Sequence, residues 1–202
     1  MGLDTYANLK TALANHSHRA DLTAYMGDFI TLAEQDIWDD LRVKEMAARA
    51  TVSTSSGTRY ENTPTGLLSV RRIYLNTSPI QHMQYQSPEQ ITSVYQNSAG
   101  KPKYYSIIGG EFEFERVPDA TYDLYVAYYK KLTALSDSNT SNAILTNYPA
   151  IYFYGAMVHL SLHIQDDNGA AKYKAAFDAY IANANSQTKD IELGNGLMVR
   201  AA

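Results

Sequence analysis

Two histidines four residues apart are the side chains whose spacing best suits chemistry. His159 and His163 lie in an apolar stretch that we expect to be helical, so both imidazoles fall on one helix face. Zinc hydrolases use this geometry, together with a third ligand and a glutamate that acts as general base. The residue after His159 is Leu160, where the hydrolase motif has glutamate. We therefore expect no metal site here, and keep a metal-dependent hydrolase built on this pair as an alternative.

A group of carboxylates offers a second possible chemistry. Asp36, Asp39 and Asp40 lie close together, and paired carboxylates are what glycosidases use. Their stretch is predicted to be a surface helix, where they form a solvated face together with Asp28 and Glu34. No serine has the strand-to-helix context of a nucleophile elbow. We therefore expect no catalytic residues, no cofactor and no enzyme.

The composition excludes several function classes. The chain has 202 residues, of which 19% are charged, and its net charge is −4. A generic nucleic-acid binder needs a basic surface, so this balance speaks against one. The absence of cysteine excludes disulfides and thiolate metal sites. No apolar stretch approaches the ~20 residues that span a bilayer, so we expect no membrane partner.

Tyrosine is the unusual component, with 17 residues against 5 Phe and 1 Trp. Many of these tyrosines lie between residues 104 and 154. Rings at the edge of a core would explain them, as would a protein–protein surface, where tyrosine is enriched. A platform that stacks carbohydrate or DNA bases is a third possibility, since Lys101, Lys103, Lys130 and Lys131 are near, although glutamates lie between them.

The elements that position these residues change in type along the chain. Leu22, Phe29, Ile37 and Leu41 follow a helical period, and residues 149–162 and 170–184 predict two further helices. Residues 51–61 predict a hairpin around Gly57, and strands are expected at 67–75, 104–108 and 122–129. Residues 111–115 alternate, with phenylalanines facing one way and glutamates the other.

The predicted fold class is therefore α+β, a mainly helical bundle with an inserted antiparallel β subdomain. We expect the N-terminal bundle helices at 1–49, the β insertion with a short helix at 50–134, and the C-terminal helices at 135–193. Residues 194–202 form an apolar, glycine-broken tail without periodicity.

Several motifs in this order resemble the tailed-phage head-to-tail adaptor proteins of the SU10 adaptor type. They are DLRVKEM at 40–46, SPEQ at 87–90, GKPKYYSIIG at 100–109, VPD at 117–119 and YPAIYFYGA at 148–156. The resemblance extends from about residue 5 to about residue 185.

The resemblance implies a structural virion protein. Such adaptors form a ring below the portal, with one copy per portal subunit and therefore twelve copies. The ring joins the portal to the tail tube or nozzle and extends the DNA channel, through which genomic DNA passes without specific binding. The implied location is the neck between head and tail, after assembly in the host cytoplasm.

The resemblance to these adaptors leads to the candidate site residues. The C-terminal segment of such adaptors often inserts into the portal, so we expect Leu197, Met198, Val199 and Arg200 to dock there. A ring needs two different contact surfaces per subunit, and surplus tyrosines suit them. We expect Tyr104, Tyr105, Tyr125 and Tyr129 at subunit contacts. A Tyr-rich carbohydrate- or DNA-binding module remains an alternative.

Overall fold

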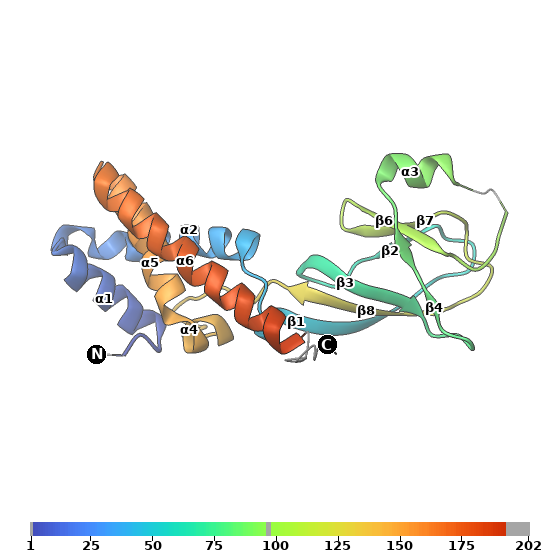
Figure 1. Cartoon of the computed structure of the whole chain (residues 1–202), viewed down its shortest axis with the longest axis horizontal. Coiled ribbons are helices and arrows are strands. Elements are labelled where there is room, and N and C mark those ends of the chain that lie inside the picture. Colours follow the sequence, from blue (N-terminus) through green and yellow to red (C-terminus); the bar gives the residue numbers. More distant parts are fainter. Residues whose placement is uncertain (1, 96–97, 193–202) are drawn as a thin grey trace, which may run out of the picture. The chain divides into compact units, whose positions relative to one another are not determined.

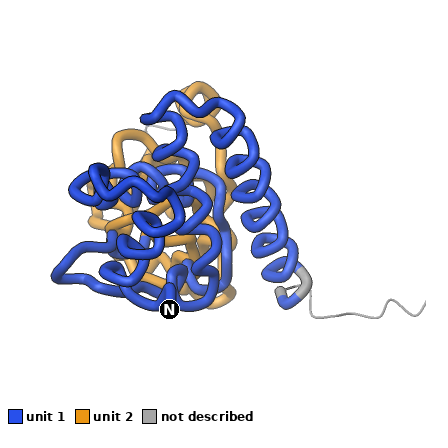
Figure 2. Tube along the Cα trace, turned by 90° about the vertical axis from the view of Figure 1, so that its left-hand side faces the viewer, with its two compact units in different colours: residues 1–46, 132–202 blue, residues 47–131 orange. Residues whose placement is uncertain are grey.

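The chain folds into two compact units. The computed structural model describes residues 2–95 and 98–192. Unit 1 combines Met1–Met46 with Leu132–Ala202, and unit 2 is Ala47–Lys131 (Figure 2). These boundaries lie three residues before the expected ones at 49 and 134. Helical and antiparallel parts are both present, so the α+β class is confirmed (Figure 1).

Unit 1 is helical. Its elements are α1 (Tyr6–Ser17), the 3-10 helix η1 (Ala20–Tyr25), α2 (Met26–Asp40), the 3-10 turn η2 (Lys44–Met46), α4 (Ala143–Asn147), α5 (Pro149–His163) and α6 (Asp167–Glu192). Thr5 caps α1, because its hydroxyl accepts a hydrogen bond from the Asn8 amide at 3.2 Å. Within the described ranges, no helix is both long and apolar enough to cross a membrane.

The core of unit 1 is built around α5, which packs against both α2 and α6. The predicted apolar stripe of α2 is confirmed, since Phe29, Ile30, Ala33 and Ile37 are all buried. Glu34 was expected on the polar face, and that prediction is wrong: its side chain is fully buried. The helical period gives the direction of a side chain, but it does not give the width of the face that neighbouring elements cover.

The described residues of unit 2, 47–95 and 98–131, form eight strands and one short helix. They are β1 (Ala47–Ser53), β2 (Tyr60–Asn62), β3 (Leu67–Leu75), β4 (Gln81–His82), β5 (Gln84–Tyr85), α3 (Pro88–Ser93), β6 (Tyr104–Ile108), β7 (Glu111–Phe114) and β8 (Asp123–Lys130). One sheet has the order β1-β8-β3-β4 and the other β2-β7-β6-β5. All pairs are antiparallel except β5 with β6.

The expected hairpin over residues 51–61 is wrong. Its two strands belong to different sheets, since β1 pairs with β8 and β2 pairs with β7. The turn at Gly57 does exist, with a positive φ of 87°. The chain therefore passes from the first sheet, where Val52 pairs with Leu124 of β8, to the second sheet, where β2 pairs with β7. The β6–β7 turn at Gly109 and Gly110 is a true hairpin turn, as expected.

The two sheets of unit 2 enclose one apolar core. It contains Ile73, Leu75, Met83, Tyr105, Phe112, Phe114, Leu124, Val126 and Tyr128. The alternation in residues 111–115 places Phe112 and Phe114 in this core, and two of the glutamates on the other face are buried as well. Glu113 and Glu115 are buried. Arg59 pairs with Glu113 at 2.8 Å, and the amides of Lys103 and Tyr104 donate to Glu115, which compensates their burial.

Candidate interaction surfaces

The histidine pair is held by neighbours other than a metal. His159 Nε2 lies 2.9 Å from Asp36 Oδ2, so this imidazole links α5 to α2. His163 packs beside the rings of Tyr25 and Phe29, at centroid distances of 5.9 and 5.4 Å. No group of three His, Cys, Asp or Glu side chains that could hold a metal occurs among residues 2–95 and 98–192. These contacts give both histidines packing roles and give the hydrolase alternative no support.

A buried polar network joins α2 to the loop that re-enters unit 1. Glu34 Oε1 accepts hydrogen bonds from the Leu135 amide at 2.8 Å and from the Tyr152 hydroxyl at 3.0 Å. Asn142 Nδ2 in turn donates to the Tyr152 oxygen at 2.7 Å. Burial, with Glu34 as a second cause, raises the pKa of Tyr152 well above its usual value. The network therefore fixes residues 135–142, the segment that leads into α4.

Aromatic side chains line a groove in unit 1. We call this the aromatic groove: a hollow of about 630 Å³ between α1, α5 and α6, lined by Leu3, Ala12, Asn15, His16, His18, Ala150, Phe153, Tyr154 and Tyr180. The Tyr154 and Tyr180 rings stack at 5.4 Å with an angle of 13°. Tyr180 is 44% exposed, so this ring pair is accessible from outside unit 1. The lining is mainly apolar and aromatic, with Asn15, His16 and His18 as its polar members.

The second surface is the outer face of the first sheet, opposite the core of unit 2. We call it the arginine–tyrosine face and define it as Arg49, Arg71, Arg72, Tyr74, Tyr125 and Tyr129. The register places Arg49, Ala127 and Arg72 side by side on β1, β8 and β3. Thr51, Tyr125 and Tyr74 form the next row on the same face. Two guanidinium groups therefore flank a methyl group, with two phenol rings beside them.

A bulge in β3 brings a third arginine to this surface. The pairing of β3 with β8 shifts between Val70 and Arg72, so Arg71 is the extra residue. In a regular strand Arg71 and Arg72 would face opposite sides. Here both are exposed, and the Arg71 guanidinium lies 5.1 Å from the centre of the Tyr129 ring. The period of two in the sequence does not reveal this, because a bulge changes the period at one residue.

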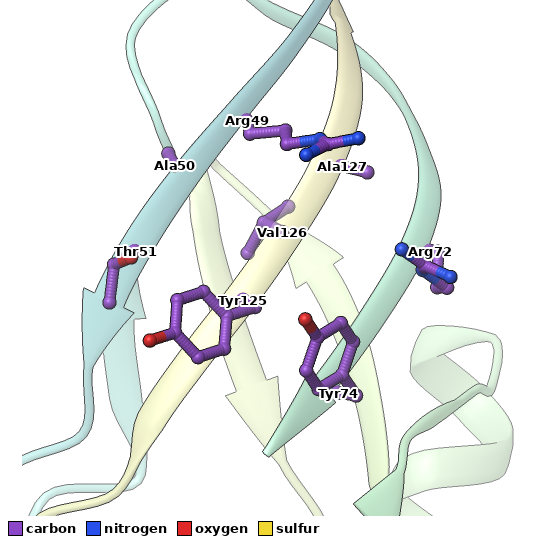
Figure 3. Close-up of a pocket in the computed structure, with 8 residues that line it drawn as sticks. All are labelled: Arg49, Ala50, Thr51, Arg72, Tyr74, Tyr125, Val126 and Ala127. Atoms are coloured by element: carbon purple, nitrogen blue, oxygen red, sulfur yellow. The ribbon is translucent and has the colours of Figure 1, made fainter. Parts of the chain in front are cut away.

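The face is hollowed where Ala127 lies. A cavity of about 340 Å³ is lined by Arg49, Ala50, Thr51, Arg72, Tyr74, Tyr125, Val126 and Ala127. Figure 3 shows the Arg49 side chain extending over β8 and the rings of Tyr74 and Tyr125 beside each other. Those rings are 5.4 Å apart, and Asn76 donates to the Tyr125 hydroxyl at 3.4 Å. In the described part of the chain, neither Arg49 nor Arg72 has a carboxylate within 4.0 Å.

The four tyrosines proposed for subunit contacts differ in their surroundings. Tyr125 and Tyr129 are half-buried members of the arginine–tyrosine face, and Tyr104 is half-buried on β6. Tyr105 is 6% exposed and belongs to the core of unit 2, where burial raises its pKa. Its ring therefore has little free area for a partner. Leu197, Met198, Val199 and Arg200 lie outside the described residues.

Sequence reasoning missed the arginines that lie between the selected tyrosines. A signal was present, because Arg71 and Arg72 interrupt the strand at 67–75 with two adjacent charges. The aromatic groove was missed for a different reason: its residues come from three helices that are far apart in the chain.

Comparison with known proteins gives the family. No curated protein matches the chain. The family model described as SU10 adaptor protein matches residues 4–200, which is nearly the whole chain. That family implies a structural adaptor of phage virions that contacts other virion proteins. The chain therefore belongs to the SU10 adaptor protein family.

Proposed function

We propose that the chain forms the head-to-tail adaptor ring in the neck of a tailed-phage virion, joining the portal to the tail tube or nozzle. The ring has twelve copies, one per portal subunit, and extends the channel through which genomic DNA passes. It assembles in the host cytoplasm and catalyses no reaction. The observation that carries the proposal is the family match over residues 4–200.

The surfaces described above support this role. A closed ring needs two different contact surfaces on each subunit, because one patch must meet another as the rotation proceeds. The aromatic groove of unit 1 and the arginine–tyrosine face of unit 2 are two such surfaces, rich in the Tyr and Arg side chains that stabilise protein interfaces. The net charge of −4 suits a channel wall that DNA slides past, since like charges repel.

In this proposal the tail residues Leu197, Met198, Val199 and Arg200 dock in the portal, the first three through their apolar side chains. The test mixes the full chain with purified portal rings of the same phage and measures the mass of the complex by mass photometry. We expect the full chain to add twelve copies per portal, and a chain lacking residues 194–202 to lose portal binding.

A variant with serine at positions 197, 198 and 199 keeps the length of the tail and is the matched control for its apolar character. It should bind as weakly as the deletion. Undiminished binding by both variants would overturn the docking role of the tail. If the full chain itself fails to bind any portal ring, the adaptor function is wrong.

A further inference from the structure

The two units carry net charges of opposite sign. Unit 1 contains 14 acidic and 8 basic residues, so its net charge is −6 with neutral histidines. Unit 2 contains 7 acidic and 9 basic residues, so its net charge is +2. Surfaces of opposite potential attract and select each other during association. Contacts between copies that join unit 1 to unit 2 are therefore favoured over contacts between like units.

Part of the negative charge of unit 1 comes from three aspartates at the carboxyl end of α2. Asp36, Asp39 and Asp40 lie in the last turns of α2, which has no basic residue in its last turn. The carboxyl end of a helix carries partial negative charge, so these positions are electrostatically unfavourable. Asp39 and Asp40 are exposed, and no ion pair of either side chain occurs in the described ranges. The fold itself does not explain this placement, which suggests a role in a contact.

The positive charge of unit 2 includes two arginines, Arg49 and Arg72, that have no carboxylate within 4.0 Å among the residues that the structure describes. Arg49 and Arg72 flank Ala127 on neighbouring strands, so their Cα atoms are about 10 Å apart. The small Ala127 side chain leaves a hollow of about 340 Å³ between them. A carboxylate entering this hollow would reach both guanidinium groups, each of which can donate two parallel hydrogen bonds. Tyr74 and Tyr125 would cover the apolar part of the incoming side chain.

We infer that the arginine–tyrosine face of one copy binds the acidic end of α2 of the next copy, with Asp39 and Asp40 meeting Arg49 and Arg72. This inference rests on the proposed ring and assigns one of its contacts. It is a heterologous contact, because the two surfaces differ, and repeating it generates a ring or a filament. It also gives Tyr125 and Tyr129 their place at the subunit boundary.

Nucleic acid is the other polyanion that arginines could meet. A DNA backbone is bound by many cations along its length, whereas unit 2 has a net charge of only +2. The mixture of three arginines with three tyrosines is instead the composition of protein interface centres. A second copy of this chain is therefore the occupant that the charges favour.

The absence of cysteine from the chain allows a direct test by cross-linking. One preparation carries Asp39→Cys with an affinity tag, and the other carries Arg72→Cys without a tag. The two are mixed at high concentration, with and without portal rings, and oxidised. In the control mixture, Thr92→Cys, at an exposed position on α3, takes the place of Arg72→Cys. We expect disulfide-linked heterodimers of Asp39→Cys and Arg72→Cys to be about tenfold or more as abundant as the heterodimers of the control mixture. Links between two Arg72→Cys chains as the main product would indicate a symmetric contact and overturn the inference.

Charge exchange gives an independent readout of the same contact. Arg49→Glu with Arg72→Glu should weaken self-association about tenfold or more, as should Asp39→Lys with Asp40→Lys. A chain with all four changes carries the exchanged charges on both surfaces and should recover most of the association. High salt should weaken the self-association of the wild-type chain, because it screens the charges of the contact.

The outcomes separate this contact from the adaptor function. If rings form on the portal but neither cross-linking nor charge exchange shows the contact, this inference is wrong and the adaptor function stands. If the wild type forms no ring on the portal, the proposed function fails. If Arg49→Glu with Arg72→Glu lowers the retention of duplex DNA and leaves self-association unchanged, the face binds nucleic acid instead.

Discussion

At the scale of single residues, the Tyr152 hydroxyl joins two polar side chains, because it donates to Glu34 and accepts from Asn142. The Tyr152 side chain is fully buried, so its hydroxyl needs these partners, whereas Asn142 Nδ2 has a second acceptor in the Thr133 carbonyl oxygen at 3.2 Å. Tyr152→Phe keeps the packing volume but leaves Asn142 without this acceptor and Glu34 without one donor. We expect a loss of about 1–2 kcal/mol of unfolding free energy near neutral pH.

The destabilising effect of the same substitution should become smaller in alkali. The pKa of Tyr152 is raised in the folded chain, so above about pH 10 the unfolded chain loses this proton while the folded chain keeps it. The unfolded state then binds fewer protons, and stability falls as pH rises, by up to about 1.4 kcal/mol per pH unit from this one group. Tyr152→Phe removes that contribution. Urea unfolding measures the free energy of unfolding at about pH 9 and at about pH 11. Between these two pH values, that free energy should fall less for the variant than for wild type.

The control for this experiment is Tyr154→Phe, two residues along α5, whose half-buried ring lines the aromatic groove. We expect it to keep the alkaline slope of the wild type. Equal slopes for Tyr152→Phe and wild type would mean that the Tyr152 hydroxyl also ionises in the folded protein.

At the scale of elements, Gly155 allows three helices of unit 1 to meet. A Cβ atom at this position would lie 3.0 Å from the Ala33 Cβ on α2 and 3.0 Å from the Phe177 Cε2 on α6. Both neighbours are buried and have little space to move. Gly155→Val should therefore lower the unfolding free energy by about 2 kcal/mol, since extra methyl groups in a packed core force shifts of helix and rotamer.

Leu162→Val on the same helix is the matched change, because Leu162 is 53% exposed. We expect it to change stability by less than about 0.5 kcal/mol. Thermal unfolding followed by far-UV circular dichroism compares the two variants. A Gly155→Val chain as stable as wild type would show that α2 and α6 can move apart without cost.

The elements also show how far the sequence predicts this fold. The α2 stripe, the SPEQ helix start and the β6–β7 turn were predictable, because each depends on residues within a few positions of one another. The Ser87 side chain does accept from the Gln90 amide, as its capping motif predicts. The pairing of β1 with β8 was not predictable in this way, since Ala47 and Tyr129 are distant in the chain. Glu34 and the arginine–tyrosine face were missed for the same reason: tertiary neighbours decide their burial.

At the scale of the whole molecule, unit 2 enters and leaves through one pair of strands. Ala47 at the start of β1 pairs with Tyr129 near the end of β8, so the two connections to unit 1 begin about 5 Å apart. Each unit also buries its own apolar residues, with the unit 2 core contained within residues 48–128. This arrangement is that of an insertion, and it predicts that the two units fold separately.

We therefore expect residues 47–131 to unfold cooperatively when they are expressed alone. In a second variant, about four Gly and Ser residues replace residues 47–131, and we expect this chain to keep the helical circular dichroism of unit 1. The short linker suffices because the two ends it joins are already neighbours across a strand pair. A linker of the same length inserted after Gly57, with unit 2 kept, controls for the linker itself, since Gly57 lies in an exposed turn. A 47–131 fragment that melts without cooperativity would show that its core depends on unit 1. The linker-joined chain also lacks the arginine–tyrosine face, so it should retain tail-dependent portal binding while losing the contact between copies that Arg49 and Arg72 provide.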